Sequence, residues 1–230
     1  MTARVIDTET TSSDPKEAKI VSIASIDLDR DGGFSNPLDV LCDPQCPIPP
    51  EASAVNHIID DDVRGRPLFR EIIDRFGGAD VYIAHNAAYD RVLLDEALGH
   101  PKWICTMKVA YRVWPDAPGF SNQALRYWRK LIEPLGVARK SVLPHDALSD
   151  VFVTGAVFLE LAKEAKFSDM MAWTDEPTLL IKCNFGTKHK GRLYSEIAKD
   201  DRGYLEWLAY KSEMNDDVKY TARHWLEAKC

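Results

Sequence analysis

The sequence predicts an α/β fold built on a mixed five-stranded sheet, in which an antiparallel meander is followed by parallel strands and helices flank the sheet. Two observations predict it. Residues 3–42 contain three extended runs joined by turn-forming residues. From residue 78 onward, short apolar runs alternate with helical patterns, which favours parallel strands because a parallel pair needs a long crossover. A small C-terminal appendage follows the sheet.

The first three strands come in direct succession. An apolar run over residues 3–10 leads into a polar turn at 11–15, and residues 20–28 alternate with a period of two. The turn at 31–33 then precedes a third extended run at 37–42. Connections this short join antiparallel neighbours, so these runs form the meander.

The alternation of strand and helix begins after a proline-rich connection at residues 44–50. A helical stripe runs from Pro67 to Gly78, and residues 81–84 form a short apolar strand. A helix that includes residues 92–98 and a fifth strand at 103–105 complete the sheet. In open sheets of this kind a ligand binds beyond the carboxyl ends of the strands.

The composition is that of a compact globular chain. Its 230 residues are 45% hydrophobic, enough for a full core. There is no signal peptide and no run of about 18 apolar residues, so we expect a soluble, cytoplasmic protein without a membrane partner. The five cysteines form no disulfide framework and are expected to be reduced. The length fits a main domain at residues 1–166 and a small module at 167–230.

The first strand ends in two carboxylates one residue apart. Side chains alternate along an extended chain, so Asp7 and Glu9 point to the same side. Taken alone, Asp-x-Glu is most simply a solvated strand end. The alternative is a pair of hard oxygen ligands for a divalent cation, and the other Asp and His residues decide between them.

A second polar group follows the strand at residues 81–84. Asn86 can cap the next helix, and His85 is most simply explained as a packed, hydrogen-bonded histidine. Asp90 lies in the first turn of that helix. An acid there is favoured by the helix dipole, and it also faces the ligand end of the sheet.

A third polar group precedes an apolar helix that runs to Leu161. Asp146 is its predicted N-cap, which leaves His145 in the loop and places Asp150 in the first turn. Taken alone, His145 is most simply an exposed loop histidine, although a loop residue can also move toward a substrate.

Together the three groups predict a metal site. Asp7, Glu9, Asp90 and Asp150 would meet at one edge of the sheet beside His145, and four clustered carboxylates are costly unless cations bind them. Two divalent cations about 4 Å apart are the arrangement that hydrolyses phosphodiesters, and a histidine suits the proton transfer from water. Because bound cations make such a cluster nearly neutral, the net charge of −7 does not exclude a nucleic-acid partner.

These groups resemble the three exonuclease motifs of the DEDDh superfamily, in order and separation: Asp7-Thr8-Glu9-Thr10, residues 85–90, and residues 145–150 with His-x4-Asp spacing. The resemblance implies a ribonuclease H-like fold and metal-dependent 3′-to-5′ removal of nucleoside 5′-monophosphates. It implies that the four acids hold two divalent cations, Mg²⁺ or Mn²⁺, and that His145 is the general base. More weakly, it places four residues against the terminal nucleotide: Thr8, Thr10, His57 and Asn86.

The resemblance to DNA-degrading bacterial members of the superfamily continues beyond the motifs, in residues 104–108, 114–115 and 121–122 and in the tail at 185–192 and 203–208. It implies that DNA is the substrate. Two alternatives stay open: a ribonuclease of the same superfamily that trims RNA 3′ ends, and a non-catalytic DNA-binding or polymerase-associated subunit on the same fold. Dimers occur in the superfamily, which leaves a homodimer open.

One position departs from the superfamily pattern. The first motif is usually followed by Gly and a bulky apolar residue that packs against bases at the 3′ end, whereas this chain has Ser12-Ser13. A polar serine cannot wedge a base pair apart. We therefore expect single-stranded or frayed 3′ ends to be preferred.

The C-terminal module contains a basic segment. Residues 182–192 hold four cations and no acid, and Gly186 and Gly191 bracket a predicted hairpin. A solvated turn is the simplest interpretation. In an acidic protein this segment is also the clearest candidate for contacts to phosphates, through Lys188, Lys190 and Arg192. Two short aromatic-rich helices are predicted after it, and we expect the module to help hold DNA.

Overall fold

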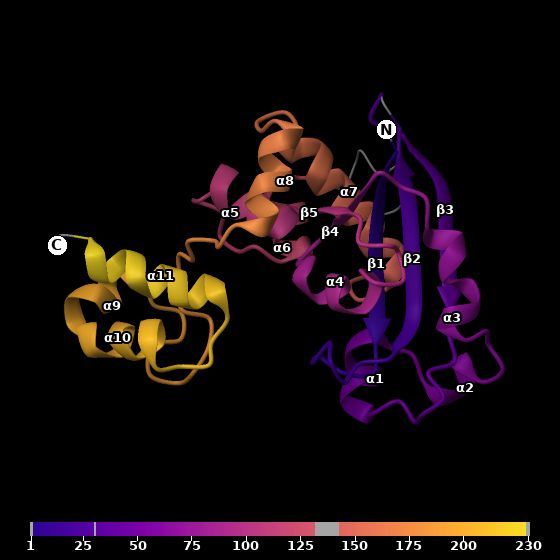
Figure 1. Cartoon of the computed structure of the whole chain (residues 1–230), viewed down its shortest axis with the longest axis horizontal. Helices are drawn as coiled ribbons and strands as arrows, with labels where there is room; N and C mark the ends of the chain where they lie inside the picture. The colour runs from indigo at the N-terminus through magenta and orange to yellow at the C-terminus, as the bar shows by residue number, and fades with distance from the viewer. Residues whose placement is uncertain (1, 30, 132–142, 229–230) are drawn as a thin grey trace.

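The computed structural model of the chain describes residues 2–29, 31–131 and 143–228. Its sheet has the strand order β3-β2-β1-β4-β5 (Figure 1). β1 (Ala3–Thr10) pairs antiparallel with β2 (Ile20–Leu28) and parallel with β4 (Val81–Ala84). β3 (Phe34–Leu41) and β5 (Lys102–Cys105) form the edges. The predicted mixed five-stranded sheet, with its meander and its parallel strands, is confirmed.

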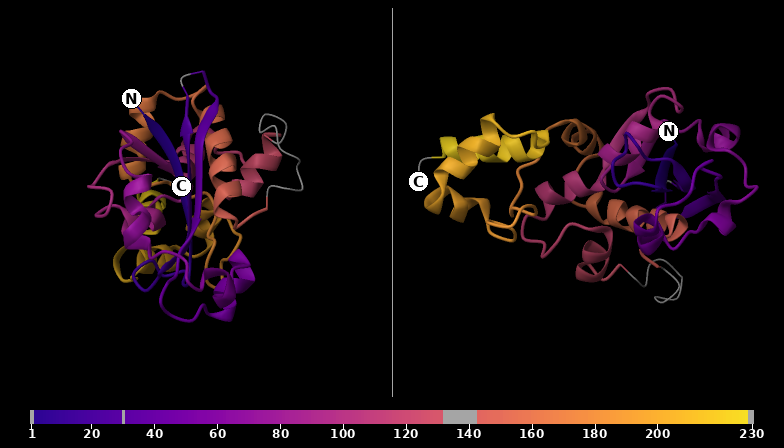
Figure 2. Two further views of the ribbon diagram at one scale, coloured as in Figure 1. Left: turned by 90° about the vertical axis from the view of Figure 1, so that its right-hand side faces the viewer. Right: turned by 90° about the horizontal axis from the view of Figure 1, so that it is seen from below.

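Helices cover both faces of the sheet. α7 (Ala147–Leu161) packs on one face, while α3 (Phe69–Ile72), the 3-10 helix η1 (Ile73–Phe76) and α4 (Ala88–Leu94) pack on the other (Figure 2). The first eight residues of β2 are all buried as a result. Gly155 lets α7 approach the sheet closely, because a Cβ atom there would lie 2.5 Å from Phe34 Cε1.

Two short helices follow the predicted proline-rich connection at residues 44–50. α1 (Pro50–Asn56) begins with a proline at its first position, where proline is favoured. α2 (Asp60–Val63) follows after His57, whose backbone is left-handed with a φ of 61°. Ile48 and Val63 pack with Val21 in a satellite core, which explains why these turns form despite their weak helical pattern.

Three further helices belong to the sheet domain: α5 (Thr106–Val113), α6 (Asn122–Trp128) and α8 (Phe167–Asp175). α8 packs against β5 and α5, and Met170 is fully buried in the same core as α7. The core of the sheet therefore includes residues beyond 166. No helix in the described ranges is both long and apolar enough to cross a bilayer.

The C-terminal residues build a second core. α9 (Tyr194–Asp200), α10 (Arg202–Tyr210) and α11 (Asp216–Glu227) pack around Cys183 and Leu205. They form a compact group beside the sheet domain (Figure 1, Figure 2). The described residues 194–227 thus contain three helices, whereas two were predicted for the C-terminal module.

The hairpin predicted around Gly186 and Gly191 forms only at its base, where Cys183 N donates to Arg192 O at 2.9 Å and Gly191 N donates to Cys183 O at 2.7 Å. Residues 182–193 contain one antiparallel bridge, between Lys182 and Leu193, and no strand. Between the two arms, His189 turns into the module and is buried there, with its Nε2 atom 2.9 Å from Asp201 Oδ2.

Candidate active site

The predicted catalytic residues lie where elements end or begin. Asp7 and Glu9 occupy the carboxyl half of β1, and His145 and Asp150 flank the N-terminus of α7. Asp146 caps α7 as predicted, because its Oδ1 atom accepts a 2.8 Å hydrogen bond from a backbone amide of the first turn. The cap ends the helix short of His145, which is exposed in the loop with a φ of 60°.

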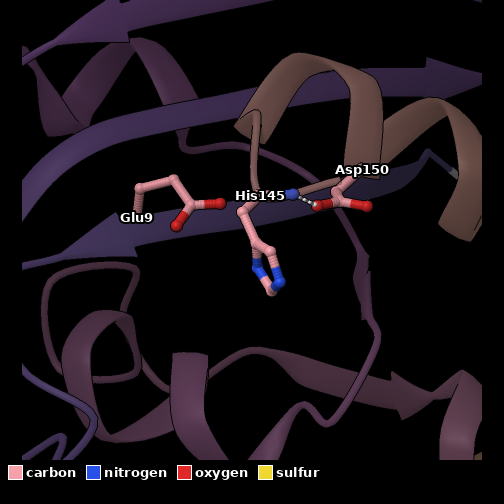
Figure 3. A group of neighbouring side chains, drawn as sticks. All are labelled: Glu9, His145 and Asp150. Atoms are coloured by element: carbon pink, nitrogen blue, oxygen red, sulfur yellow. Dashed lines mark hydrogen bonds between the residues drawn. The ribbon is translucent and has the colours of Figure 1, made fainter. Parts of the chain in front are cut away.

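The structure brings Glu9, His145 and Asp150 together. A ring nitrogen of the histidine and one carboxylate oxygen of each acid all lie within 4.8 Å of one another. Figure 3 shows the imidazole between the two acids, and the backbone amide of His145 donates a 2.7 Å hydrogen bond to Asp150 Oδ2. Residues more than a hundred positions apart in the sequence therefore form one site.

Asp7 and Asp90 belong to the same electrostatic cluster. Burial raises the pKa of Asp7 well above its ordinary range, and the charges of Asp90, Asp150 and Glu9 raise it further. Burial, together with the charges of Asp150 and Asp90, raises the pKa of Glu9 to about 8. Burial also raises the pKa of Asp90 to about 7 and that of Asp150 above its usual value. The protein alone does not stabilise four negative charges here.

The donor set fits divalent cations. All four acids offer hard carboxylate oxygens, the ligands that Mg²⁺ and Mn²⁺ prefer. Burial raises the pKa of all four acids, and the charges of the other acids raise those of Asp7 and Glu9 further, so added positive charge would lower them again. Bound cations would thus keep Asp7, Glu9, Asp90 and Asp150 ionised.

Thr8 supports the cluster through Asp90. Its Oγ1 atom donates a 2.8 Å hydrogen bond to Asp90 Oδ1, and both residues are buried. This bond lowers the pKa of Asp90 and so acts against the larger effect of burial. The Thr8 side chain therefore positions a predicted metal ligand, and a nucleotide contact at Thr8 would use its backbone.

The loop after β1 is tied to both α4 and α1. Tyr89 Oη is hydrogen-bonded to Thr10 Oγ1 and to Ser12 O, and Asn56 Nδ2 donates a 3.2 Å hydrogen bond to Thr10 O. Asn56 is buried, while the next residue, His57, is exposed. Thr10 and His57, two of the residues predicted to meet the terminal nucleotide, thus lie on adjoining segments.

The second motif holds one exposed and one packed side chain. Asn86 does not cap α4, whose N-cap is Ala87, because its own backbone is left-handed with a φ of 62°. Its side chain is exposed at the ligand end of the sheet. His85 is hydrogen-bonded as the sequence indicated, with Nδ1 2.8 Å from Thr106 Oγ1 and Nε2 2.7 Å from Phe120 O. Burial lowers the pKa of His85 to about 4.

Three residues that contact the site were missed from the sequence. Gln123 on α6 has its Nε2 atom 3.5 Å from Asp150 Oδ1, and the buried Arg126 donates a 3.0 Å hydrogen bond to Gln123 Oε1. The other two are Asn56 and Tyr89. Tyr89 lies inside the second motif, which was a usable signal, whereas Gln123 and Asn56 lie on elements that only the fold brings to the site.

The predicted phosphate contacts lie in the C-terminal module, on a core separate from this cluster. Lys188 pairs with Asp201, and Arg192 pairs with Asp200, while Lys190 is exposed. These acids follow the basic segment in sequence and fold back against it. The segment is therefore less positive than its own sequence indicates.

Known proteins resemble the whole chain. The sequence matches the exonuclease family (RNase_T: Exonuclease) over residues 5–158. It is 37% identical over 229 residues to Exodeoxyribonuclease 10 of Escherichia coli (strain K12), which covers 97% of this chain and 98% of that protein. It is 38% identical over 95 residues to DNA polymerase III subunit epsilon of Treponema pallidum (strain Nichols), covering 40% of this chain and 44% of that protein.

A solved structure shows the same similarity in three dimensions. Exonuclease X in complex with 5′ overhanging duplex DNA matches with a TM-score of 0.64 and 35% sequence identity, covering 75% of this chain and 99% of that chain. The family match spans every residue from Asp7 to Asp150. The chain therefore belongs to the exonuclease family, has its ribonuclease H-like fold, and is a hydrolase of phosphodiester bonds.

Proposed function

We propose that this protein is a metal-dependent 3′-to-5′ exodeoxyribonuclease that releases nucleoside 5′-monophosphates from DNA. The observation that carries the proposal is the meeting of Glu9, His145 and Asp150 within 4.8 Å in a chain of the exonuclease family. Asp7 and Asp90 are coupled electrostatically to these residues. DNA is favoured over RNA because the similarity to Exodeoxyribonuclease 10 covers nearly the full length of both chains.

The proposed roles follow from the geometry. Asp7, Glu9, Asp90 and Asp150 would hold two divalent cations, Mg²⁺ or Mn²⁺, which would supply the Lewis-acid charge that phosphodiester hydrolysis needs. His145 accepts the proton of the attacking water, since its imidazole is exposed and lies beside two of these acids. The hydrogen bond from its backbone to Asp150 keeps the loop in place during the transfer.

The substrate contacts are proposed on position and exposure. His57 and Asn86 are exposed around the acidic cluster, and Thr10 is fixed next to His57 through Asn56. These residues would hold the terminal nucleotide with its phosphodiester over the acids. The C-terminal module, which has a core of its own, would hold DNA farther from the cut end.

One assay tests the proposal. Labelled single-stranded DNA, duplex DNA with a 5′ overhang, blunt duplex DNA and RNA of matched sequence are incubated with Mg²⁺ and the wild-type protein, Asp7→Ala or His145→Ala. Release of 5′-monophosphates from DNA, abolished by a chelator and reduced by several powers of ten in both variants, supports it. Asp61→Asn, which changes an exposed acid paired with Arg64, is the control and should keep full activity.

The same assay separates the alternatives. Release from RNA without release from DNA would identify a ribonuclease of the same superfamily. Binding of DNA without release under any metal would identify a non-catalytic subunit. Either result would overturn the proposed function.

A further inference from the structure

Three aromatic rings form a row on the surface of the C-terminal module. The ring centroids of His189 and Tyr204 are 4.6 Å apart, and those of Tyr204 and Trp207 are 5.8 Å apart with an interplanar angle of 28°. His189 is buried at one end of the row, and Trp207 is 45% exposed at the other. The stacked pair of Tyr204 and Trp207, which ends in an exposed indole, offers a flat, rigid surface to a further ring.

Lysines lie on the same loop and helix as these rings, although Lys188 pairs with Asp201. Lys188, whose side chain is 70% exposed, and Lys190 lie on the loop that contributes His189. Gly186 of the same loop passes close to Tyr204, because a Cβ atom there would lie 3.8 Å from Tyr204 Oη. Lys211, four residues after Trp207, is exposed at the end of α10. An exposed aromatic surface on elements that also carry exposed lysines suits a base with its phosphates.

The nearly neutral charge of the module permits an anionic partner. Residues 182–228 contain nine Lys and Arg and eight Asp and Glu, whereas the whole chain has a net charge of −7. The acidic excess thus belongs to the rest of the chain, where cations at the active site would offset part of it. The module is the part of the protein to which a polyanion can come without strong repulsion.

The segment between the two cores is held at both ends. From α5, Lys108 Nζ donates to Glu176 O at 2.9 Å and Arg112 Nη2 donates to Pro177 O at 2.9 Å. From α11, Asp217 Oδ1 accepts a 2.8 Å hydrogen bond from Thr178 N. A segment bonded to both sides fixes the module relative to the sheet domain, so a strand that contacts both does so over a set length.

We propose that Trp207, stacked on Tyr204 in a module that carries the exposed Lys190 and Lys211, is a second nucleic-acid site that stacks a base of a single strand upstream of the end being cut. The proposal rests on the proposed function, because it takes the strand that the active site degrades as its ligand. It adds a specific contact to the general expectation that the module holds DNA. Base stacking on an indole is independent of sequence, as an exonuclease that works along a strand requires.

The test uses binding, so that it does not depend on catalysis. Full-length His145→Ala protein is titrated with fluorescently labelled oligodeoxynucleotides of increasing length, from a dinucleotide to a 20-mer, in Mg²⁺. We expect Trp207→Ala to weaken binding of the long strands about tenfold or more and to leave the dinucleotide unchanged, since stacking of one base contributes about 1–3 kcal/mol. Trp207→Phe should restore most of the loss.

The matched control is Tyr220→Ala. Tyr220 is 42% exposed on the neighbouring helix α11, so this variant removes a similarly exposed aromatic ring from the module. It should bind strands of all lengths like the parent. Lys211→Gln should in addition lower the slope of log Kd against log salt by about 0.7, the value for one phosphate contact on a single strand.

Two results would overturn the proposal: equal binding of the 20-mer by Trp207→Ala and its parent, or an equal loss in Tyr220→Ala. Failure of the proposed function is distinguishable, because the titration is repeated with RNA. A length-dependent loss seen only with RNA would keep the stacking site and assign the enzyme to RNA.

Discussion

The backbone amide of His145 donates a 2.7 Å hydrogen bond to Oδ2 of Asp150. This bond joins the proposed general base to a proposed metal ligand. Asp150 is buried in the first turn of α7, so it is a fixed point from which the exposed His145 loop is held beside Glu9. The two residues nevertheless have separate tasks, and substitutions should separate them.

His145→Ala and Asp150→Asn should both be nearly inactive, for different reasons. His145→Ala removes the proton acceptor and should lower kcat about 10²- to 10⁴-fold without weakening Mn²⁺ binding. Asp150→Asn keeps the shape of the side chain but removes a charged ligand, so it should lower kcat about 10³-fold or more and also weaken Mn²⁺ binding. Nucleotide release and calorimetric Mn²⁺ titration measure the two effects. Equal Mn²⁺ affinities in both variants would contradict the assignment.

Gln123 should position Asp150 without touching the substrate. The two Asp150 oxygens face different groups, since Oδ2 accepts from His145 N and Oδ1 lies 3.5 Å from Gln123 Nε2. Arg126 holds the Gln123 amide in turn. Gln123→Met removes the amide at similar volume, and we expect kcat to fall about tenfold with KM unchanged. In Gln123→Glu, kcat should fall further, because the substitution adds a carboxylate beside Asp150. A rise in KM alone, with kcat intact, would refute this role.

Tyr89→Phe should loosen the loop after β1. The substitution removes only the hydroxyl group that is bonded to Thr10 and Ser12. A hydrogen bond of this kind contributes about 0.5–1.5 kcal/mol, so the free energy of unfolding should fall by that amount. Because Thr10 is proposed to contact the nucleotide, KM should also rise severalfold while kcat changes little. Thermal unfolding and steady-state kinetics measure the two effects, and an unchanged KM would mean that the loop does not meet the substrate.

Most of the sheet could be predicted from the sequence because local residue patterns define its strands. Period-two alternation and short turns define the first three strands, and the apolar runs at residues 81–84 and 103–105 define the last two. The cap at Asp146 was also predictable, since a capping carboxylate acts on the next turn of its own helix.

The features that could not be predicted from the sequence depend on contacts between distant segments. The turns of α1 and α2 form because Ile48 and Val63 pack with Val21, which no local pattern shows. The basic segment is partly neutralised by Asp200 and Asp201, whose return to it is set by the fold of the module. Asn86 fails to cap α4 because its own backbone is left-handed, and the sequence contains no sign of that.

The stability of the metal-free protein should fall as pH rises. Folding raises the pKa of Asp90 to about 7 and that of Glu9 to about 8, so the folded state holds more protons than the unfolded state above about pH 4. The stability that these protons contribute is complete below that pH and is lost as pH passes through 7 and 8. Mg²⁺ binds only the ionised acids, so its stabilising effect should grow over the same range.

Thermal unfolding at pH 6 and pH 8.5, with EDTA or with Mg²⁺, measures this effect. The rise in Tm caused by Mg²⁺ should be larger at pH 8.5, and Glu9→Gln should reduce the difference because it removes one titrating ligand. Asp61→Asn is again the control, since this acid is exposed on α2. An Mg²⁺ effect that is independent of pH would show that these acids are not the ligands.

Single-stranded DNA should be degraded faster than blunt duplex DNA. Ser12 lies on the loop at the end of β1, where its carbonyl accepts hydrogen bonds from Thr10 and Tyr89 and its hydroxyl accepts one from Asp14 N at 3.1 Å. A serine held in polar contacts cannot insert between bases. The free-energy cost of opening the last base pair, a few kcal/mol, is therefore not offset by contacts from this residue. We expect at least about a tenfold higher rate on the single strand, given that about 1.4 kcal/mol corresponds to tenfold. Ser12→Leu should lower the ratio of the single-strand rate to the duplex rate, because it should raise the duplex rate. Equal rates of the wild-type protein on both substrates would show that another residue opens the duplex.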